Sequence, residues 1–264
     1  MLGEHFLYSL SSISIVLVLF SLLVVFNQCG YWLGQKYKND DDGDIKALTN
    51  AVQTSTLGLL ALLLGFTFSM SMQRYDQRNQ AMIAETNEVQ NLVLQVQLLP
   101  EQHQQQLLPM IHKYVEQRLE LGQIDITRFD ERAAYQAKVK VIQQAMWLSV
   151  AQIAQQNNLD MSVITKQLQL VFETYNKRNA LLMMHVPEVV IYLLFTVFVS
   201  AFCILGYSSG LASKRIIIPT TMVMFLITMI VFIIIDLDRP KRGLIKVNQD
   251  SMQLIATELQ QIKH

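Results

Sequence analysis

The sequence predicts an all-α membrane protein with four transmembrane helices in two hairpins and an extramembrane helical bundle inserted between the second and third helices. Of its 264 residues, 52% are hydrophobic and only 16% are charged. The apolar residues gather in four segments long enough to cross a bilayer, whose hydrocarbon core of about 30 Å requires about 20 helical residues. A glutamine-rich block with few glycines separates the second segment from the third and is typical of helices.

No charged residue interrupts the interior of the four apolar segments, which lie near Leu10–Leu33, Val52–Met72, Pro187–Tyr207 and Ile216–Ile235. The first is interpreted as a retained helix, because residues 1–12 hold no lysine or arginine and no small-x-small cleavage site follows. We therefore expect a first transmembrane hairpin over residues 1–72, a helical domain over 73–184, a second hairpin over 185–238, and a tail with a short helix over 239–264.

The second segment is expected to continue out of the bilayer as one long helix. No proline or glycine occurs between Phe66 and Leu99, so a helix from Asp44, its predicted N-cap, to Leu99 would have about 55 residues and a length of about 80 Å. Beyond the membrane its apolar positions recur every seven residues, at Tyr75, Met82, Val89 and Val96. This stripe indicates either a coiled coil or a packed helical bundle.

Four further helices are predicted outside the membrane, near Glu101–Leu121, Arg128–Gln156, Asp160–Met184 and Ser251–Ile262. Pro109 is expected either to kink the first of them or to mark its true start. Each has an apolar face that must be buried, so we expect them to stack on the extended second helix.

The charge distribution predicts the orientation. Four spans place the helical domain and both termini on one side. Basic residues near the membrane on that side are Arg74, Arg78, Lys177, Arg178, Arg239, Lys241, Arg242 and Lys246, against Lys36, Lys38, Lys46, Lys214 and Arg215 on the other. The positive-inside rule therefore predicts a cytoplasmic domain and cytoplasmic termini.

The sequence predicts no catalytic, cofactor-binding or metal-binding residue. It contains no GxSxG, P-loop or GxGxxG motif, which argues against an enzyme, and its net charge of +0 argues against a nucleic-acid partner. The acidic loop Asn39–Asp44 fails as an EF-hand, because aligning Gly43 to position 6 puts Lys38 at position 1 and Thr49 at position 12. The histidines lack metal-site spacing, and the two cysteines, Cys29 and Cys203, suggest free thiols in apolar segments.

The second membrane helix carries two stripes at helical spacing. Small residues that would let helices approach closely in lipid recur at Gly58, Ala61, Gly65 and Ser69, continuing back to Thr54. On an adjacent face, Leu62, Phe66 and Met70 would form a hydrophobic constriction if several copies surrounded an axis. Thr54 and Ser55 are further pore candidates. The alternative is that both stripes pack within the subunit or contact lipid.

Charged residues cluster where the apolar segments end. Arg74 and Arg78 follow the second segment, in a stretch that also holds Asp76, Glu85 and Glu88 and is either a solvated face or the mouth of a pore. Asp236, Asp238 and Arg239 end the fourth segment. The two aspartates are spaced i, i+2 and do not share a helix face, so they are interpreted as caps and ion-pair partners of Arg239, Lys241, Arg74 or Arg78. Arg74, Arg78, Asp236, Asp238 and Arg239 are thus assigned to a membrane–cytoplasm junction.

Four stretches carry a family resemblance: "LLGFTFSMSMQRYDQRNQAMIAETNEV", "LLPEQHQQQLLPMIHKYVEQRL", "YNKRNALLMMHVPEVVIYLL" and "IDLDRPKRGLIKVNQ". In this order and spacing the chain resembles the bestrophin-like domain family of bacterial membrane proteins over residues 57–254. The resemblance implies a remote similarity to bestrophins, which are pentameric anion channels whose second membrane helix lines the pore. It also implies that Leu62, Phe66 and Met70 occupy the positions of the bestrophin neck. No dense acidic cluster matches the bestrophin calcium clasp, so neither calcium gating nor chloride is carried over.

Two functions follow as hypotheses. The first is a homo-oligomeric ion channel of the bacterial inner membrane, pentameric as the resemblance implies, whose partners are lipid, further copies of the chain and an inorganic ion. The second is a non-conducting scaffold or accessory subunit that binds a protein through its helical domain.

Overall fold

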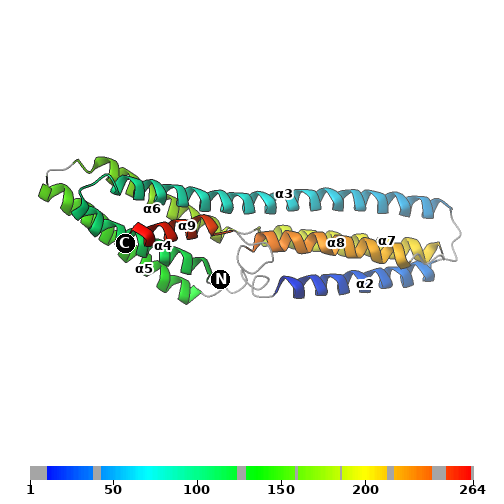
Figure 1. Cartoon of the computed structure of the whole chain (residues 1–264). Helices are drawn as coiled ribbons and strands as arrows, with labels where there is room; N and C mark the ends of the chain where they lie inside the picture. The colour runs from blue at the N-terminus through cyan, green and yellow to red at the C-terminus, as the bar shows by residue number, and fades with distance from the viewer. Residues whose placement is uncertain are drawn as a thin grey trace. The chain divides into compact units, whose positions relative to one another are not determined.

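The computed structural model describes residues 11–37, 43–123, 129–157, 160–184, 186–212, 217–239 and 248–262. All regular structure in these ranges is helical (Figure 1), which confirms the all-α prediction for this part of the chain. The helices are α2 (Ser12–Lys36), α3 (Gly43–Val96), α4 (Glu101–Gln123), α5 (Phe129–Asn157), α6 (Ser162–Met183), α7 (Glu188–Leu211), α8 (Ile217–Asp238) and α9 (Asp250–Ile262). The described residues do not include most of the acidic loop or five of the basic residues counted above, namely Lys214, Arg215, Lys241, Arg242 and Lys246.

Four of these helices are long and apolar enough to cross a membrane, namely α2, α3, α7 and α8. Helix α3 has 54 residues, so the prediction of one unbroken helix through and beyond the second apolar segment is confirmed. Pro109 lies inside α4, which begins at Glu101. The interpretation of Pro109 as the helix start is therefore wrong, since about two turns of α4 precede this residue. The alternative, that Pro109 kinks the helix, stays a prediction.

The chain forms two compact units. One, here called the apolar unit, comprises residues 1–73 and 185–239, and the other, here called the polar unit, comprises residues 74–184 and 240–264. Helix α3 contributes its first part to the apolar unit and its second part to the polar unit.

In the apolar unit, α2 packs along α7 and also against α8 (Figure 1). Glycines set the distance between α2 and α7. A Cβ added to Gly30 would lie 2.0 Å from the carbonyl oxygen of Cys203, and one added to Gly206 would lie 2.0 Å from that of Asn27. The two backbones are therefore in direct contact. The predicted hairpins pair α2 with α3 and α7 with α8, whereas the most extensive helix pair of this unit joins α2 to α7.

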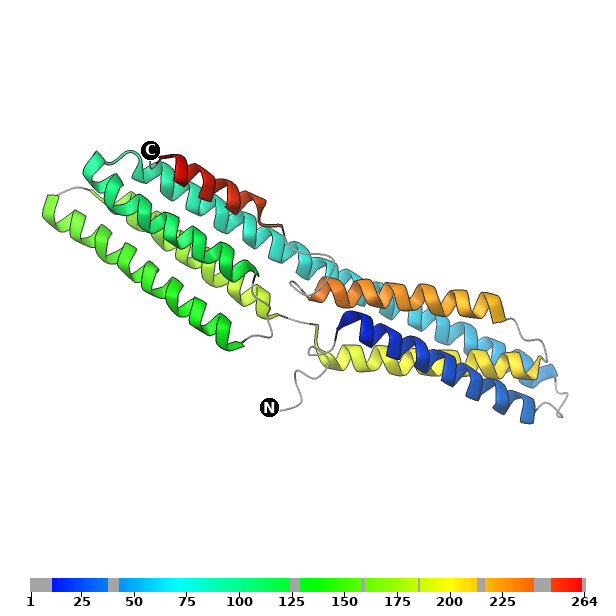
Figure 2. The ribbon, with the colours of Figure 1, turned by 60° about the horizontal axis from the view of Figure 1, so that its bottom comes forward.

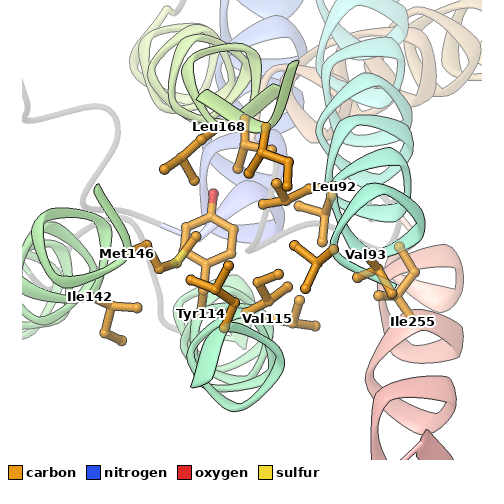
Figure 3. Close-up of a cluster of buried hydrophobic side chains, with 14 of the residues drawn as sticks. Leu92, Val93, Tyr114, Val115, Ile142, Met146, Leu168 and Ile255 are labelled. Atoms are coloured by element: carbon orange, nitrogen blue, oxygen red, sulfur yellow. The ribbon is translucent and has the colours of Figure 1, made fainter. Parts of the chain in front are cut away.

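In the polar unit, the seven-residue stripe of α3 is buried from Met82 onward, while its first member, Tyr75, is half-buried. Met82, Val89 and Val96 are at most 1% exposed and belong to a core that α4, α5, α6 and α9 complete. Figure 3 shows side chains of these helices converging around Tyr114. Helix α9, red in Figure 2, packs against α4, and its residues Met252 and Ile255 are buried in this core. The stripe thus packs in a bundle made by the chain's own helices, as one of the two alternatives predicts.

Candidate functional site

Helix α3 buries only a narrow stripe in the apolar unit. Leu60, Leu64, Thr67 and Ser71, spaced by three or four residues, are buried. The opposite side, with Leu62 at 55% and Phe66 at 64%, is exposed, and Met70 is half-buried. Each step of four residues turns a helix by about 40°, so the row from Leu62 to Met70 drifts toward the buried side. The three neck candidates share one side of the helix, and two of them face away from the chain's own core.

Polar groups accompany this exposed face near the start of the apolar segment. Thr54 and Ser55 are exposed, and their hydroxyls donate to the carbonyl oxygens of Asn50 at 2.9 Å and Ala51 at 3.0 Å. Because a hydroxyl that donates to its own helix still has acceptor lone pairs, each can accept a hydrogen bond from water or a second chain.

The small residues predicted to pack helices are exposed in the single chain. Gly58, Ala61, Gly65 and Ser69 all lie on the open side of α3. A Cβ added to Gly58 or Gly65 would meet no atom within 4 Å. Whether these residues pack helices of different copies stays a prediction.

The close helix approach inside the chain depends on glycines that the sequence reasoning missed. Gly30 and Gly34 of α2 meet Gly206 and Gly210 of α7, where an added Cβ would lie between 2.0 and 2.5 Å from a carbonyl oxygen of the facing helix. Both pairs have the G-x-x-x-G spacing that permits backbone contact in lipid. That spacing was a usable signal, and it is present on the first and third apolar segments.

The acidic residues at the end of α8 are buried in the apolar unit. Asp236, Asp238 and Arg239 are 2%, 3% and 5% exposed. Both carboxylate oxygens of Asp238 accept the backbone N–H of Val186 at 3.1 Å, close to the first residue of α7. Arg239 Nη1 donates to the hydroxyl of Ser12 at 3.4 Å. Asp238 and Arg239 therefore bind groups near the starts of α7 and α2.

Arg78 caps a helix within the polar unit, whereas Arg74 is half-buried. Arg78 Nε donates to the carbonyl oxygen of Leu181 at 3.2 Å, and Nη2 donates to that of Met184 at 2.6 Å. These carbonyls close the C-terminus of α6, where a cation is favourable.

A buried ion cluster joins three helices of the polar unit. Glu85 of α3, 0% exposed, accepts from Arg118 Nε at 2.5 Å and Nη2 at 2.8 Å, from Arg178 Nη1 at 2.7 Å and from the Tyr114 hydroxyl at 2.9 Å. Arg118 also lies 4.5 Å from the ring centroid of Tyr175. The expectation that Glu85 lies on a solvated face or at a pore mouth is wrong, because two arginines of α4 and α6 enclose it.

The charges of this cluster are strongly coupled. Burial alone would raise the pKa of Glu85, but attraction and hydrogen bonding from Arg118 and Arg178 outweigh burial and lower the pKa from 4.5 to about 2. The carboxylate is thus ionised throughout the physiological range.

Acid is expected to weaken the polar unit through Glu85. Because its pKa is lower in the folded than in the unfolded chain, the stabilisation is complete above pH 4.5 and is lost as the pH falls toward 2, by about 3 kcal/mol in total. Chemical denaturation at pH 7, 4 and 3 measures this loss. The slope between pH 4.5 and 2 should flatten in Glu85→Gln, and an unchanged slope would contradict the assignment to Glu85.

Comparison with known proteins identifies a family model and solved structures that this chain resembles. The sequence model of the Bestrophin-like domain matches residues 14–252, while no curated protein matches the chain. Two crystal structures of point variants of a bacterial Bestrophin homolog from Klebsiella pneumoniae are similar. One has a TM-score of 0.73 at 15% identity, covering 96% of this chain and 98% of that chain, and the other has 0.70 at 17% identity, covering 94% and 98%.

A third similar structure, described as a membrane protein, has a TM-score of 0.66 at 14% identity and covers 96% of this chain and 99% of that chain. At these identities the structural likeness shows the fold, and the sequence model shows the family. With four membrane-length apolar helices and a match over most of its length, the chain belongs to the Bestrophin-like domain family of multi-pass membrane proteins.

Proposed function

We propose that the protein is a homo-oligomeric ion channel of the bacterial inner membrane, with its conduction path along α3 and its neck at Leu62, Phe66 and Met70. The observation that carries the proposal is the composition of the exposed face of α3. Side by side on that face lie a row of small residues, including Gly58 and Gly65, and a row of large apolar residues, including Leu62 and Phe66.

The exposed face of α8 supplies the contrast. From Met222 onward the exposed residues of α8, which include Phe225, Leu226 and Met229, are all large and apolar, as expected for contact with acyl chains. The exposed face of α3 instead includes glycine, alanine, serine and threonine at regular spacing. A glycine adds no apolar surface for contact with lipid. It does favour contact between helices of neighbouring copies, because small residues allow the backbones to approach.

Neighbouring copies that met through the small residues would bring the row of Leu62, Phe66 and Met70 to a shared axis. A ring of such side chains forms an apolar constriction that ions cross only when it is hydrated, which is a recognised way to gate a pore. Five copies is the number that the family resemblance implies. Thr54 and Ser55 would supply hydroxyls along the same path.

The orientation completes the proposal. The helical domain and both termini are cytoplasmic, in agreement with the basic residues that follow the apolar segments. Within the polar unit Arg78 holds the end of α6, and within the apolar unit Asp238 and Arg239 bind groups near the starts of α7 and α2, as proposed for residues that follow a membrane span.

Truncating the neck is expected to change conduction. In planar bilayers containing the purified protein, Phe66→Ala should increase the current several-fold, because it removes the larger exposed side chain of the proposed constriction. Phe225→Ala is the matched control, since Phe225 is 60% exposed on α8 against 64% for Phe66 on α3. It should leave the current unchanged.

Absence of current from the folded wild-type protein, under varied ions, voltage and pH, would contradict a channel. That result would favour the non-conducting scaffold that binds a protein through its helical domain. Equal effects of Phe66→Ala and Phe225→Ala on the current would contradict the proposed position of the neck, but not the proposal that the protein conducts ions.

A further inference from the structure

The apolar unit contains a cavity away from the proposed conduction path. Its volume is about 170 Å³, and its lining comes from α2, α7 and α8, with no residue of α3. Liquid water occupies about 30 Å³ per molecule, so the cavity could hold about five waters or a small organic group. Six of its nine lining residues are polar, namely Asn27, Gln28, Tyr31, Ser209, Thr220 and Thr221.

The lining selects an uncharged ligand. None of the nine residues is acidic, basic or histidine, so neither a phosphate nor an ammonium group would find a counter-charge. The polar groups are two amides and four hydroxyls. The Ser209 hydroxyl already donates to the carbonyl oxygen of Leu205 at 3.0 Å, whereas the Thr221 hydroxyl can donate to a ligand. Asn27 Nδ2 uses one of its two N–H groups on the carbonyl oxygen of Phe202 at 3.1 Å, which fixes the amide at the cavity wall and leaves the second N–H for a ligand. The second N–H of Asn27 and the hydroxyl of Thr221 are suitable donors for an ester carbonyl, which only accepts.

The cavity lies near one end of its helices. Thr220 and Thr221 lie within about one turn of Ile217, the first residue of α8. Gln28 precedes Lys36, the last residue of α2, by eight residues, or about 12 Å of helix. Because α2 and α8 are long enough to span the hydrocarbon core, a cavity near their ends lies close to the boundary between acyl chains and headgroups.

The entrance is apolar. Val24 and Ile217 line the cavity and are 44% and 58% exposed, and their neighbours Val25 and Ile218 are 55% and 75% exposed. A ligand with a polar, uncharged centre and apolar chains fits this arrangement, because its chains can leave past Val24 and Ile217 along exposed apolar surface.

We propose that this cavity binds the glycerol-ester region of a membrane phospholipid, with the ester carbonyls accepting hydrogen bonds from its amide and hydroxyl groups. The linkage between glycerol and acyl chain, and not the headgroup, determines the affinity. The site is independent of conduction, so it is tested by a lipid measurement and not by current.

The test is native mass spectrometry of the purified protein after exchange into phospholipids of defined structure. Diester phosphatidylglycerol should remain bound in stoichiometric amount, and the diether analogue with the same headgroup should be lost several-fold more readily. Exchange of phosphatidylglycerol for phosphatidylethanolamine, both diesters, should leave retention unchanged.

Two variants test the position of the site. Thr221→Phe fills the cavity and Thr221→Val removes a hydroxyl donor, so each should lower diester retention several-fold. Ser21→Leu is the matched control, because Ser21 is an exposed hydroxyl on α2 that donates to Leu17 and does not line the cavity. Its retention should equal that of the wild type, and thermal melting verifies that all three variants are folded.

Three outcomes would overturn the proposal. The first is equal retention of diester and diether lipid, and the second is equal retention by the cavity variants and Ser21→Leu. The third is absence of bound lipid from the folded wild-type protein, which would mean that water or a neighbouring copy fills the cavity.

Discussion

Replacing Glu85 with glutamine is expected to destabilise the polar unit by about 3–5 kcal/mol, the typical cost of removing one partner from a buried ion pair. Glutamine keeps the shape of the side chain but removes the charge that balances Arg118 and Arg178. Both guanidinium groups are at least nine-tenths buried, and Arg118 Nε lies 2.5 Å from the carboxylate. Loss of the cluster should appear as a lower denaturation midpoint by circular dichroism.

The matched control is Glu116→Gln. Glu116 lies on α4, as Arg118 does, but its side chain is 49% exposed and its partner His112 is 3.7 Å away. An exposed pair of this kind contributes at most about 1 kcal/mol. If both variants lost the same stability, the buried cluster would not be the feature that holds α3, α4 and α6 together.

Replacing Gly206 with alanine is expected to prevent normal packing of α2 on α7. The added Cβ would lie 2.0 Å from the carbonyl oxygen of Asn27, which belongs to the backbone of α2 and cannot move as a side chain does. Overpacking of a core by one methyl group typically costs 1–3 kcal/mol, and a backbone clash is at or above the top of that range. The yield of monodisperse protein after extraction, and its melting temperature, should both fall.

Gly43→Ala is the matched control for this substitution, because Gly43 begins α3 and lies outside the proposed contacts between copies. The same methyl group at Gly43 meets no atom within 4 Å. Folding of the apolar unit should therefore be unaffected. Equal damage from both variants would contradict the assignment of Gly206 to a close contact between α2 and α7.

The extents of the helices could be predicted because they depend on local properties. The length of the apolar segments and the absence of proline and glycine after Phe66 predict α3 over Asp44–Leu99, against the observed Gly43–Val96. The seven-residue stripe likewise indicates which face of α3 is buried in the polar unit, since burial follows hydrophobic periodicity.

The contacts between helices could not be predicted in the same way. The partners of Glu85 are 29, 33 and 93 positions away in the sequence, so the periodicity of α3 contains no information about them. Glycines were misjudged for a related reason. Small residues permit close approach wherever they occur, and only the fold shows that Gly34 and Gly210 meet each other while Gly58 and Gly65 remain open.

The candidate pore residues were predicted from the spacing of Leu62, Phe66 and Met70 together with a family resemblance. The single chain shows that Leu62 and Phe66 face away from its own core. Their proposed role as a neck requires other copies of the chain, about which the structure of one protomer contains no information.

The structure of the purified protein by electron cryo-microscopy tests the proposed channel most directly, with the position of α3 as the readout. We expect a ring of copies around a central axis, with Leu62 and Phe66 of every copy facing that axis and Gly58 and Gly65 at contacts between copies. A monomer or dimer, or a ring whose axis is lined by a helix other than α3, would contradict it.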